Sequence, residues 1–167
     1  MNTIKKILIK IDHLVWLVQR YRRLTKNIYN RNKKYFEGKN ALEIGGPTPL
    51  FMNKNPIPVY NILKGCDNIN WSDDNFWSSI ENGADYIINN KKYGKQIILD
   101  STDLSKIKKE SYDLILSSHA LEHLANPLKA LFEWYRVLKP NGYILIVVPD
   151  RRYTYDRLRP LTKFKHI

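Results

Sequence analysis

The stretch from Tyr112 to Val148, YDLILSSHALEHLANPLKALFEWYRVLKPNGYILIVV, decides the fold. Two continuous apolar runs, residues 112–117 and 143–148, stand on either side of a helical pattern. Asn126 can cap that helix and Pro127 fits its first turn, while the KPNG before the second run ends it. A strand, a helix and a second strand in this order indicate a crossover unit of a parallel sheet that is covered on both faces.

The predicted helix carries apolar residues at three- and four-residue steps, which predicts a buried stripe along one side. This stripe consists of Leu128, Leu131, Phe132, Tyr135 and Leu138. Arg136 and Lys139 lie near the C-terminal end of the helix, where the helix dipole favours cations.

Upstream of this unit, short apolar runs again alternate with helical patterns. ALEI at 41–44 precedes a glycine turn, KQIILD at 95–100 is a further candidate strand, and a weaker strand lies around Asp67. This alternation predicts an α/β domain with a mostly parallel sheet over residues 39–167.

Charge is distributed unevenly along the 167 residues. The chain has 28 Lys and Arg against 16 Asp and Glu, and eleven of the basic residues precede residue 40, where only Asp12 and Glu37 oppose them.

An apolar content of 43% with 12% aromatic residues argues for a folded chain rather than a disordered one. The single Cys66 excludes an internal disulfide framework and a cysteine-rich metal site, so we expect a reducing, cytoplasmic location.

The excess of positive charge lies in residues 1–38, which we predict to form a basic, amphipathic helical arm. The arm is expected either to pack on the domain with its basic face in solvent, or to bind an anionic membrane surface or a nucleic-acid backbone. We expect neither a signal peptide nor a membrane span, because Lys10, Asp12 and His13 interrupt the first apolar run.

Polar or glycine-containing segments follow the predicted strands. In an open parallel sheet, ligands bind outside the carboxyl ends of the strands, and glycines let the backbone approach a ligand closely. An acidic residue about 20 positions beyond a glycine turn suits ribose hydroxyls. The segments are EIGG at 43–46, DN at 67–68, DSTDL at 100–104 and SSH at 117–119. Together they outline a nucleoside site.

The stretch from residue 112 to 162 resembles the class I S-adenosylmethionine-dependent methyltransferases, especially bacterial ones encoded among glycan-assembly genes. The resemblance rests on the LEH helix start, the NP-capped helix, the LKPNG turn and the YDRLRPLT at 155–162. EIGGP at 43–47, CDNIN at 66–70 and DSTDL resemble the glycine motif and the second- and third-strand regions of that class. The resemblance implies a Rossmann-like fold, S-adenosylmethionine as cofactor, and in-line methyl transfer in which the protein mainly aligns the reactants.

Eight cofactor-binding residues follow from this resemblance. They are Glu43, Gly45, Gly46, Asp67, Asp103, Leu104, Ser118 and His119. The two glycines would border the methionine part, and Glu43 would organise that loop or reach the amino group. Asp67 would accept from the ribose hydroxyls.

The other four residues of this set follow later strands. Asp103 and the Leu104 backbone would contact the adenine edge, while Ser118 and His119 would lie near the carboxylate or sulfonium end. Carboxylates suit this cationic ligand because they accept hydrogen bonds from hydroxyls and amines without adding positive charge. His119 is a conceivable general base.

The resemblance implies a seven-stranded sheet, whereas only about 18 residues follow the fifth predicted strand. We therefore expect the last two strands to be missing and the exposed sheet edge to favour self-association. The main hypothesis is methyl transfer to a small acceptor, such as a glycan or sugar intermediate, near the membrane. The alternatives are a non-catalytic remnant or interaction module and, third, an RNA methyltransferase or RNA-binding protein.

Two further motifs have competing interpretations. HALEH at 119–123 matches the H-x-x-E-H zinc pattern, but it follows a strand directly and few acidic residues remain downstream, so we expect no metal. Residues 149–160 contain four arginines and two tyrosines. They form either a solvated loop or a recognition segment for a phosphorylated or acidic acceptor, or for RNA.

Overall fold

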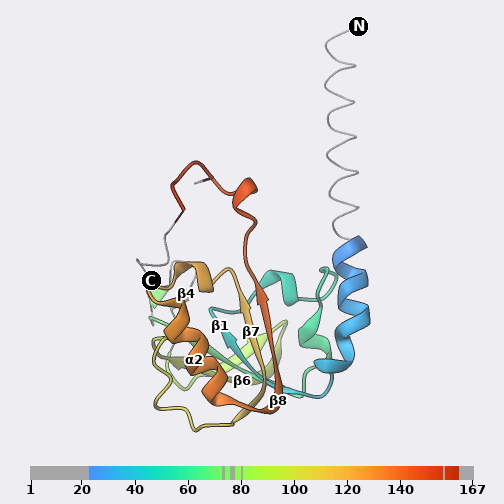
Figure 1. Cartoon of the computed structure of the whole chain (residues 1–167). Coiled ribbons are helices and arrows are strands. Elements are labelled where there is room, and N and C mark those ends of the chain that lie inside the picture. Colours follow the sequence, from blue (N-terminus) through green and yellow to red (C-terminus); the bar gives the residue numbers. More distant parts are fainter. Residues whose placement is uncertain (1–22, 73, 76–77, 80, 156, 162–167) are drawn as a thin grey trace, which may run out of the picture.

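The computed structural model describes residues 23–72, 74–75, 78–79, 81–155 and 157–161 (Figure 1). Most of the helix predicted for the arm lies outside these residues, but residues 23–32 are helical. The strands are β1 (Asn40–Ile44), β2 (Gly65–Asn70), β3 (Asp74–Asn75), β4 (Ser78–Ser79), β5 (Asp85–Ile88), β6 (Lys91–Ile98), β7 (Tyr112–Ser118) and β8 (Leu138–Val147). The helices are α2 (Pro127–Val137) and the short 3-10 turns η1 (Lys33–Tyr35), η2 (Pro49–Phe51), η3 (Val59–Ile62), η4 (Leu121–His123) and η5 (Arg151–Tyr153).

Six strands form one sheet in the order β5-β6-β2-β1-β7-β8. Only β5 is antiparallel to its neighbour, whereas the other pairs are parallel. This arrangement is the Rossmann-like fold of the class I methyltransferases, so the predicted fold class is confirmed. Within the described residues, β8 is an edge strand with β7 as its single neighbour.

The crossover unit forms largely as expected. Asn126 accepts a hydrogen bond from the Lys129 backbone N–H at 2.9 Å, and Pro127 opens α2. β8 begins at Leu138, five residues earlier than predicted, because Leu138 already pairs with Tyr112. A register shift before the next pair absorbs the KPNG segment that was expected to separate helix and strand.

The buried stripe of α2 is rotated relative to the sequence prediction. Phe132 and Tyr135 are each 74% exposed and Leu128 is 43% exposed, so the assignment of these three side chains to the core was wrong. The residues that α2 buries fully are instead Ala130, Trp134 and Val137. Trp134 also donates its Nε1–H to the Ser101 carbonyl at 3.0 Å, and this large anchored ring sets which side of the helix meets the sheet.

Two apolar clusters cover the two faces of the sheet, because successive strand residues point to opposite sides. One cluster packs α2 against Leu42, Ile44 and Ile115. The other joins Ala41 and Leu114 to η2, η3 and the buried rings of the helical arm.

The end of the arm belongs to the domain. Tyr29 and Phe36 are each 8% exposed, and the Tyr29 hydroxyl donates to the Pro58 carbonyl at 3.3 Å. Residues 23–36 therefore pack on the domain, as one of the two sequence interpretations expected. Among the helices of the described residues, none has the length and apolar character needed to cross a membrane.

Candidate functional site

A pocket of about 630 Å³ opens at the carboxyl ends of β1, β2 and β6, within the size range of small-molecule sites. We call it the carboxyl-edge pocket. Its walls are Ile44, Gly45, Ile69, Asn70, Trp71, Leu99, Asp100, Ser101, Thr102, Ala120, His123, Leu124, Ala125, Asn126 and Lys129. Of the eight residues predicted to bind the cofactor, only Gly45 lines this pocket.

The glycine turn after β1 is fixed by hydrogen bonds to β2. Gly45 has a φ of +78°, a region that favours glycine, and its N–H donates to the Ile69 carbonyl at 2.8 Å. The Asn68 side chain accepts from the Gly46 N–H at 2.9 Å and donates to the Gly46 carbonyl at 3.1 Å. A Cβ on Gly46 would collide with the Glu43 carboxyl and the Tyr86 hydroxyl. Both glycines are therefore required by the geometry of the turn.

Glu43 lies beneath the turn and is fully buried. Its carboxylate accepts from the Tyr60 hydroxyl at 2.7 and 2.8 Å, from the Tyr86 hydroxyl at 2.7 Å and from the Thr48 N–H at 3.2 Å. Burial raises the pKa of Glu43, and these hydrogen bonds oppose that rise. Of its two predicted roles, the geometry supports organising the loop, because the carboxylate contacts the turn and does not line the pocket.

Asp67 lies away from the carboxyl-edge pocket. It pairs with Leu42 inside β2, and the strand continues for three more residues, so Asn70 occupies the strand end. The Asp67 carboxylate accepts from the Lys95 N–H at 2.8 Å and from the Tyr112 hydroxyl at 2.7 Å. It lines a different hollow, near the amino ends of β1 and β7.

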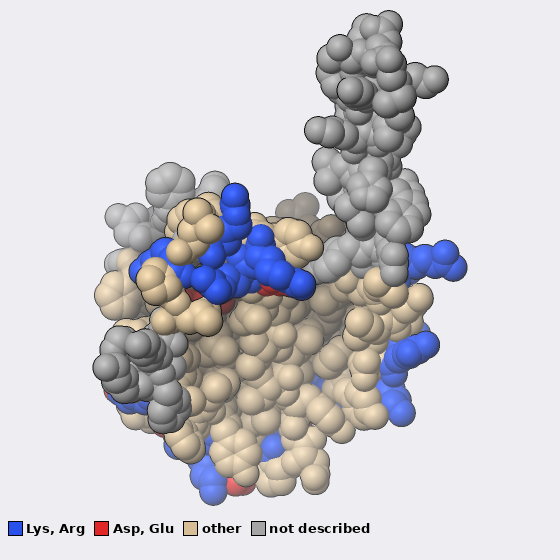
Figure 2. All heavy atoms as spheres, turned by 45° about the horizontal axis from the view of Figure 1, so that its top comes forward, with Lys and Arg blue, Asp and Glu red and all other residues tan. Residues whose placement is uncertain are grey.

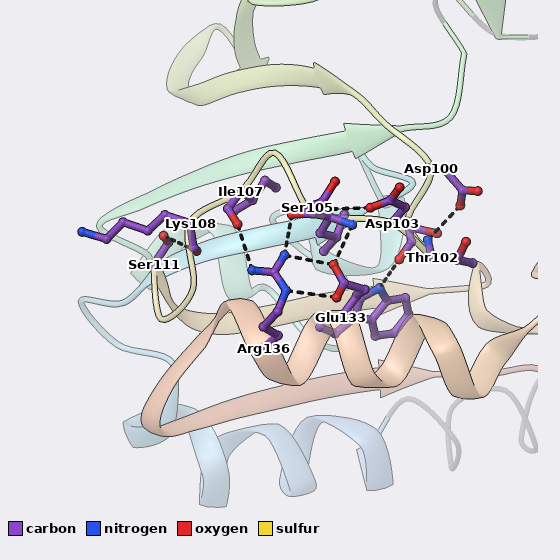
Figure 3. Close-up of polar contacts among 12 residues, drawn as sticks. Asp100, Thr102, Asp103, Ser105, Ile107, Lys108, Ser111, Glu133 and Arg136 are labelled. Atoms are coloured by element: carbon purple, nitrogen blue, oxygen red, sulfur yellow. Dashed lines mark hydrogen bonds and ion pairs between the residues drawn. The ribbon is translucent and has the colours of Figure 1, made fainter.

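The loop after β6 also places its predicted residues differently (Figure 3). Asp103 accepts from the Ser105 N–H at 3.1 Å, and the hydrogen bonds from Ser105 lower its pKa. Leu104 is buried in the core, and its N–H donates to Glu133 at 2.8 Å, so it is not available to an adenine edge. Asp100, which accepts from the Thr102 N–H at 2.8 Å, is the carboxylate that lines the pocket.

Arg136 and Glu133 of α2 hold this loop in place, as Figure 3 shows. The Arg136 guanidinium donates to the carbonyls of Leu104 and Ile107 and to both carboxylate oxygens of Glu133. The hydrogen bond from Arg136 lowers the pKa of Glu133. The loop is therefore fastened to α2 beside the pocket.

Ser118 is the last residue of β7 and His119 follows it, and neither lines the pocket. The hydroxyls of Ser117 and Ser118 are buried without a hydrogen-bond partner among the described residues. His119 has a φ of +53° and lies before η4, with its Nδ1 3.5 Å from a Glu122 carboxylate oxygen. Because η4 begins only at Leu121, the two histidines of the H-x-x-E-H pattern do not share a helix face as zinc ligands would require.

Sequence reasoning missed the pocket residues Asn70, Trp71 and Lys129. The polar composition of GCDNIN concealed the length of β2, so the strand end was placed at Asp67. The tryptophan at position 71, directly after the strand, was a usable sequence signal, because a large ring at a strand end suits a ligand face. In the structure this ring is 80% exposed.

Residues 81–146 match the family model of a methyltransferase domain. Similar solved structures include a protein from Bacillus halodurans C-125 that is assigned as a methyltransferase, with 14% identity and a TM-score of 0.52, covering 72% of this chain and 49% of that one. The YcgJ protein from Bacillus subtilis has 15% identity and a TM-score of 0.50, covering 74% of this chain and 50% of that one.

The [4+2]-cyclase SpnF has 18% identity and a TM-score of 0.50, covering 77% of this chain and 44% of that one. No curated protein sequence shows significant similarity to the chain. The chain spans about half the length of the first structures it matches. At such identities the likeness shows the fold alone, and a cyclase among the neighbours illustrates that one fold hosts different reactions.

Proposed function

We propose that the chain binds S-adenosylmethionine in the carboxyl-edge pocket and directs its methyl group to a small acceptor. The observation that carries this proposal is the 630 Å³ pocket around the Gly45 turn, in a chain of which residues 81–146 match a methyltransferase domain. When bound, S-adenosylmethionine supplies an electrophilic methyl group on a sulfonium. The chain contributes binding and alignment.

The residues that line the pocket have the polarity that such a ligand needs. Asp100 and Asn70 offer acceptors and donors for hydroxyls and amines, and the exposed ring of Trp71 offers a flat apolar surface. The positive φ of Gly45 brings backbone to the pocket wall without a side chain. We assign Glu43 and Gly46 positioning roles, because they shape the turn from below.

Calorimetric titration with S-adenosylhomocysteine tests the site through two matched variants, Asp100→Asn and Asp103→Asn. Each carboxylate accepts from a backbone N–H two residues later, and asparagine can keep that bond. We expect Asp100→Asn to weaken binding by about tenfold, as loss of a charged hydrogen bond to a ligand does, and Asp103→Asn to bind like the wild type. The reverse order would favour the site predicted from the sequence.

A third variant, Asp67→Asn, tests the hollow at the amino ends of the strands. We expect its affinity for S-adenosylhomocysteine to be unchanged, because Asp67 does not line the carboxyl-edge pocket. Absence of saturable binding to folded wild-type protein would overturn the proposal. Saturable binding without methyl transfer to any component of a cell extract would favour the interaction module.

The proposal also includes the chemical class of the methyl acceptor. The resemblance to proteins encoded among glycan-assembly genes supports a sugar-linked hydroxyl as the acceptor. Transfer of radiolabelled methyl to an isolated glycan-intermediate fraction, and not to a protein or RNA fraction, is the expected result.

Membrane association through the arm is supported by its described part. Arg23, Lys26, Arg31, Lys33 and Lys34 are exposed, as are the apolar Leu24 and Ile28. A basic helix with exposed apolar residues suits an anionic bilayer. We expect cosedimentation with phosphatidylglycerol vesicles that high salt weakens; binding to neutral vesicles alone would contradict this.

Self-association is supported by β8, which is an edge strand of the sheet within the described residues and whose Tyr143 and Ile144 are 39% and 36% exposed. A strand edge without a partner is a template for pairing with another chain. We expect sedimentation analysis to show concentration-dependent dimers that Ile144→Lys weakens. A monomer at every concentration would contradict this.

A further inference from the structure

A second hollow lies between the arm and the loop that joins η2 to η3. In Figure 1 the helix of residues 23–32 runs beside this loop. The hollow has a volume of about 390 Å³, which suits a small ligand, and we call it the arm pocket. Its walls are Lys26, Tyr29 and Asn30 of the helix and Asn53, Lys54, Asn55, Pro56 and Pro58 of the loop. It shares no residue with the carboxyl-edge pocket, so it is a separate candidate site.

Hydrogen bonds hold the two walls of the arm pocket in place. The Asn55 side chain donates to the Pro49 carbonyl at 2.6 Å, and the Asn55 backbone N–H donates to the Met52 carbonyl at 3.2 Å. The bond from the Tyr29 hydroxyl to the Pro58 carbonyl joins the loop to the helix. The pocket is therefore formed before a ligand arrives, and binding should require little ordering of the chain.

Positive charge reaches the arm pocket from both walls. Lys26 and Lys54 are exposed, and the lining contains no Asp or Glu. Within the described residues, neither ammonium group forms an ion pair. Burial and, to a smaller extent, the charge of Glu37 raise the pKa of Tyr29, but Glu37 does not line the pocket. Figure 2 shows Lys and Arg side chains on the right side of the molecule, where Figure 1 places the helix, and no Asp or Glu side chain among the coloured atoms there.

The backbone of Lys54 is an independent sign of a ligand site. Its φ is +68°, in the left-handed region that residues with a long side chain rarely adopt. Such a conformation costs free energy, and residues that adopt it are concentrated at ligand-binding and other functional sites. Glycine would adopt it without strain. The lysine therefore provides a charge at the pocket wall at a conformational cost.

We propose that the arm pocket binds a phosphate group that is esterified to a sugar or another polyol. The two ammonium groups form charged hydrogen bonds with the phosphate oxygens. The side-chain amides of Asn30, Asn53 and Asn55 provide donors and acceptors for hydroxyls, and the rings of Pro56 and Pro58 provide apolar surface for the carbon atoms. A free sugar phosphate and a phospholipid headgroup share this chemistry. The inference does not depend on the proposed methyl transfer.

The test compares two double variants with the same loss of charge. The pocket variant is Lys26→Gln with Lys54→Gln. The control is Lys33→Gln with Lys64→Gln, because both of these side chains are exposed and neither lines the pocket. Glycerol phosphate is the soluble probe, with glycerol as its uncharged reference. Phosphatidylglycerol vesicles present the same ester on a lipid, with phosphatidylcholine vesicles as the zwitterionic reference.

We expect the pocket variant to bind glycerol phosphate at least about tenfold more weakly than the wild type, with the control unchanged and glycerol not bound. If the wild type binds phosphatidylglycerol vesicles but not glycerol phosphate, and only the pocket variant loses this binding, the phosphate is that of a lipid headgroup. Equal losses in the two variants would indicate a general attraction of charges and would overturn the proposal. Absence of binding to both probes would overturn it as well.

A single variant, Lys54→Gly, separates loss of the charge from loss of the fold. Glycine relieves the left-handed backbone, so we expect a melting temperature equal to or above that of the wild type, together with weaker binding of the probe. Full affinity in this variant would overturn the role of Lys54.

S-adenosylhomocysteine separates the arm pocket from the carboxyl-edge pocket. We expect the pocket variant to bind it like the wild type, and glycerol phosphate not to compete with it, because the two pockets share no residue. Binding of glycerol phosphate that depends on Lys26 and Lys54, in a protein that never binds S-adenosylhomocysteine, would support this inference and remove the methyltransferase proposal. Competition between the two ligands would place the phosphate in the carboxyl-edge pocket and overturn the inference.

Discussion

The two faces of the sheet hold their strand-end loops by different means. On one face, a fully buried carboxylate, Glu43, accepts from Tyr60, Tyr86 and Thr48 and fixes the turn after β1. On the other face, the ion pair of Arg136 and Glu133 fixes the loop after β6, with side chains that are 30% and 21% exposed.

Both arrangements support a wall of the same pocket, but their energetics differ. Buried donors that lose their acceptor retain the full cost of desolvation. When one member of a partly solvated ion pair is removed, water can form some of the hydrogen bonds that its partner has lost. We therefore expect the glycine turn to be the more rigid wall of the pocket and the loop after β6 to be the more adaptable one.

The largest expected effect is on the face with the buried carboxylate. Glu43→Ala removes the acceptor of two hydroxyls and one N–H, and we expect it to lower the free energy of unfolding by about 3–5 kcal/mol. Glu133→Ala is the matched change on the other face and should cost about 1–2 kcal/mol. Urea denaturation measures both. Equal losses would remove the distinction between the two faces.

The pH dependence of stability sharpens the comparison because the two carboxylates shift in opposite directions. The pKa of Glu43 is raised, so the folded state keeps this proton longer, and its contribution to stability falls as pH rises through the raised pKa. The pKa of Glu133 is lowered, so its contribution is present above the unfolded pKa and is lost as pH falls. Denaturation of the wild type, Glu43→Gln and Glu133→Gln across the acidic and neutral pH range measures this. The difference in free energy of unfolding between wild type and variant should change with pH in opposite directions for the two variants.

A smaller effect is expected from Arg136→Lys. Lysine keeps the charge but cannot bridge two carbonyls and a carboxylate with one planar group, so we expect a loss of about 1 kcal/mol. Hydrogen exchange should accelerate at the Leu104 and Ile107 amides and stay unchanged at Gly45 and Gly46. Faster exchange at the glycine turn as well would show that the two walls are coupled.

The smallest effect is expected for the exposed side of α2. Phe132→Ser and Tyr135→Ser should each change the free energy of unfolding by no more than about 0.5 kcal/mol, because both rings are mostly in solvent. Thermal denaturation is sufficient to measure this. A loss of about 3 kcal/mol, as for a core aromatic residue, would instead support the stripe predicted from the sequence.

The sequence predicted the elements whose signals are local. The apolar runs of β1 and β7 and the Asn126 cap needed no knowledge of distant contacts, and all three are present. The stripe of α2 was misplaced because Phe132 and Tyr135 share a periodicity with buried residues. Only the packing of Trp134 against the loop after β6 distinguishes the two sides.

The candidate site was harder to predict because it depends on where strands end. Asp67 has the expected spacing from Gly45, but the spacing along the chain does not show that β2 continues to Asn70. Leu104 lies in the expected loop, yet its N–H is taken by Glu133, which is 29 residues away in sequence. Such long-range pairings have no local signature, whereas the glycine turn itself was identified because its backbone requirement is local.

The buried carboxylate also has a consequence for how the sequence can change over time. The Tyr60 hydroxyl donates a hydrogen bond to Glu43 and accepts one from the Thr48 N–H at 2.8 Å, so it is both donor and acceptor in the same network. Loss of either tyrosine leaves a buried charge with fewer donors, and loss of Glu43 leaves both hydroxyls without an acceptor. Residues 43, 60 and 86 should therefore show strong epistasis, in which replacing all three by apolar residues costs less than the sum of the three single replacements, with the Thr48 N–H, which loses both acceptors, as the remaining cost.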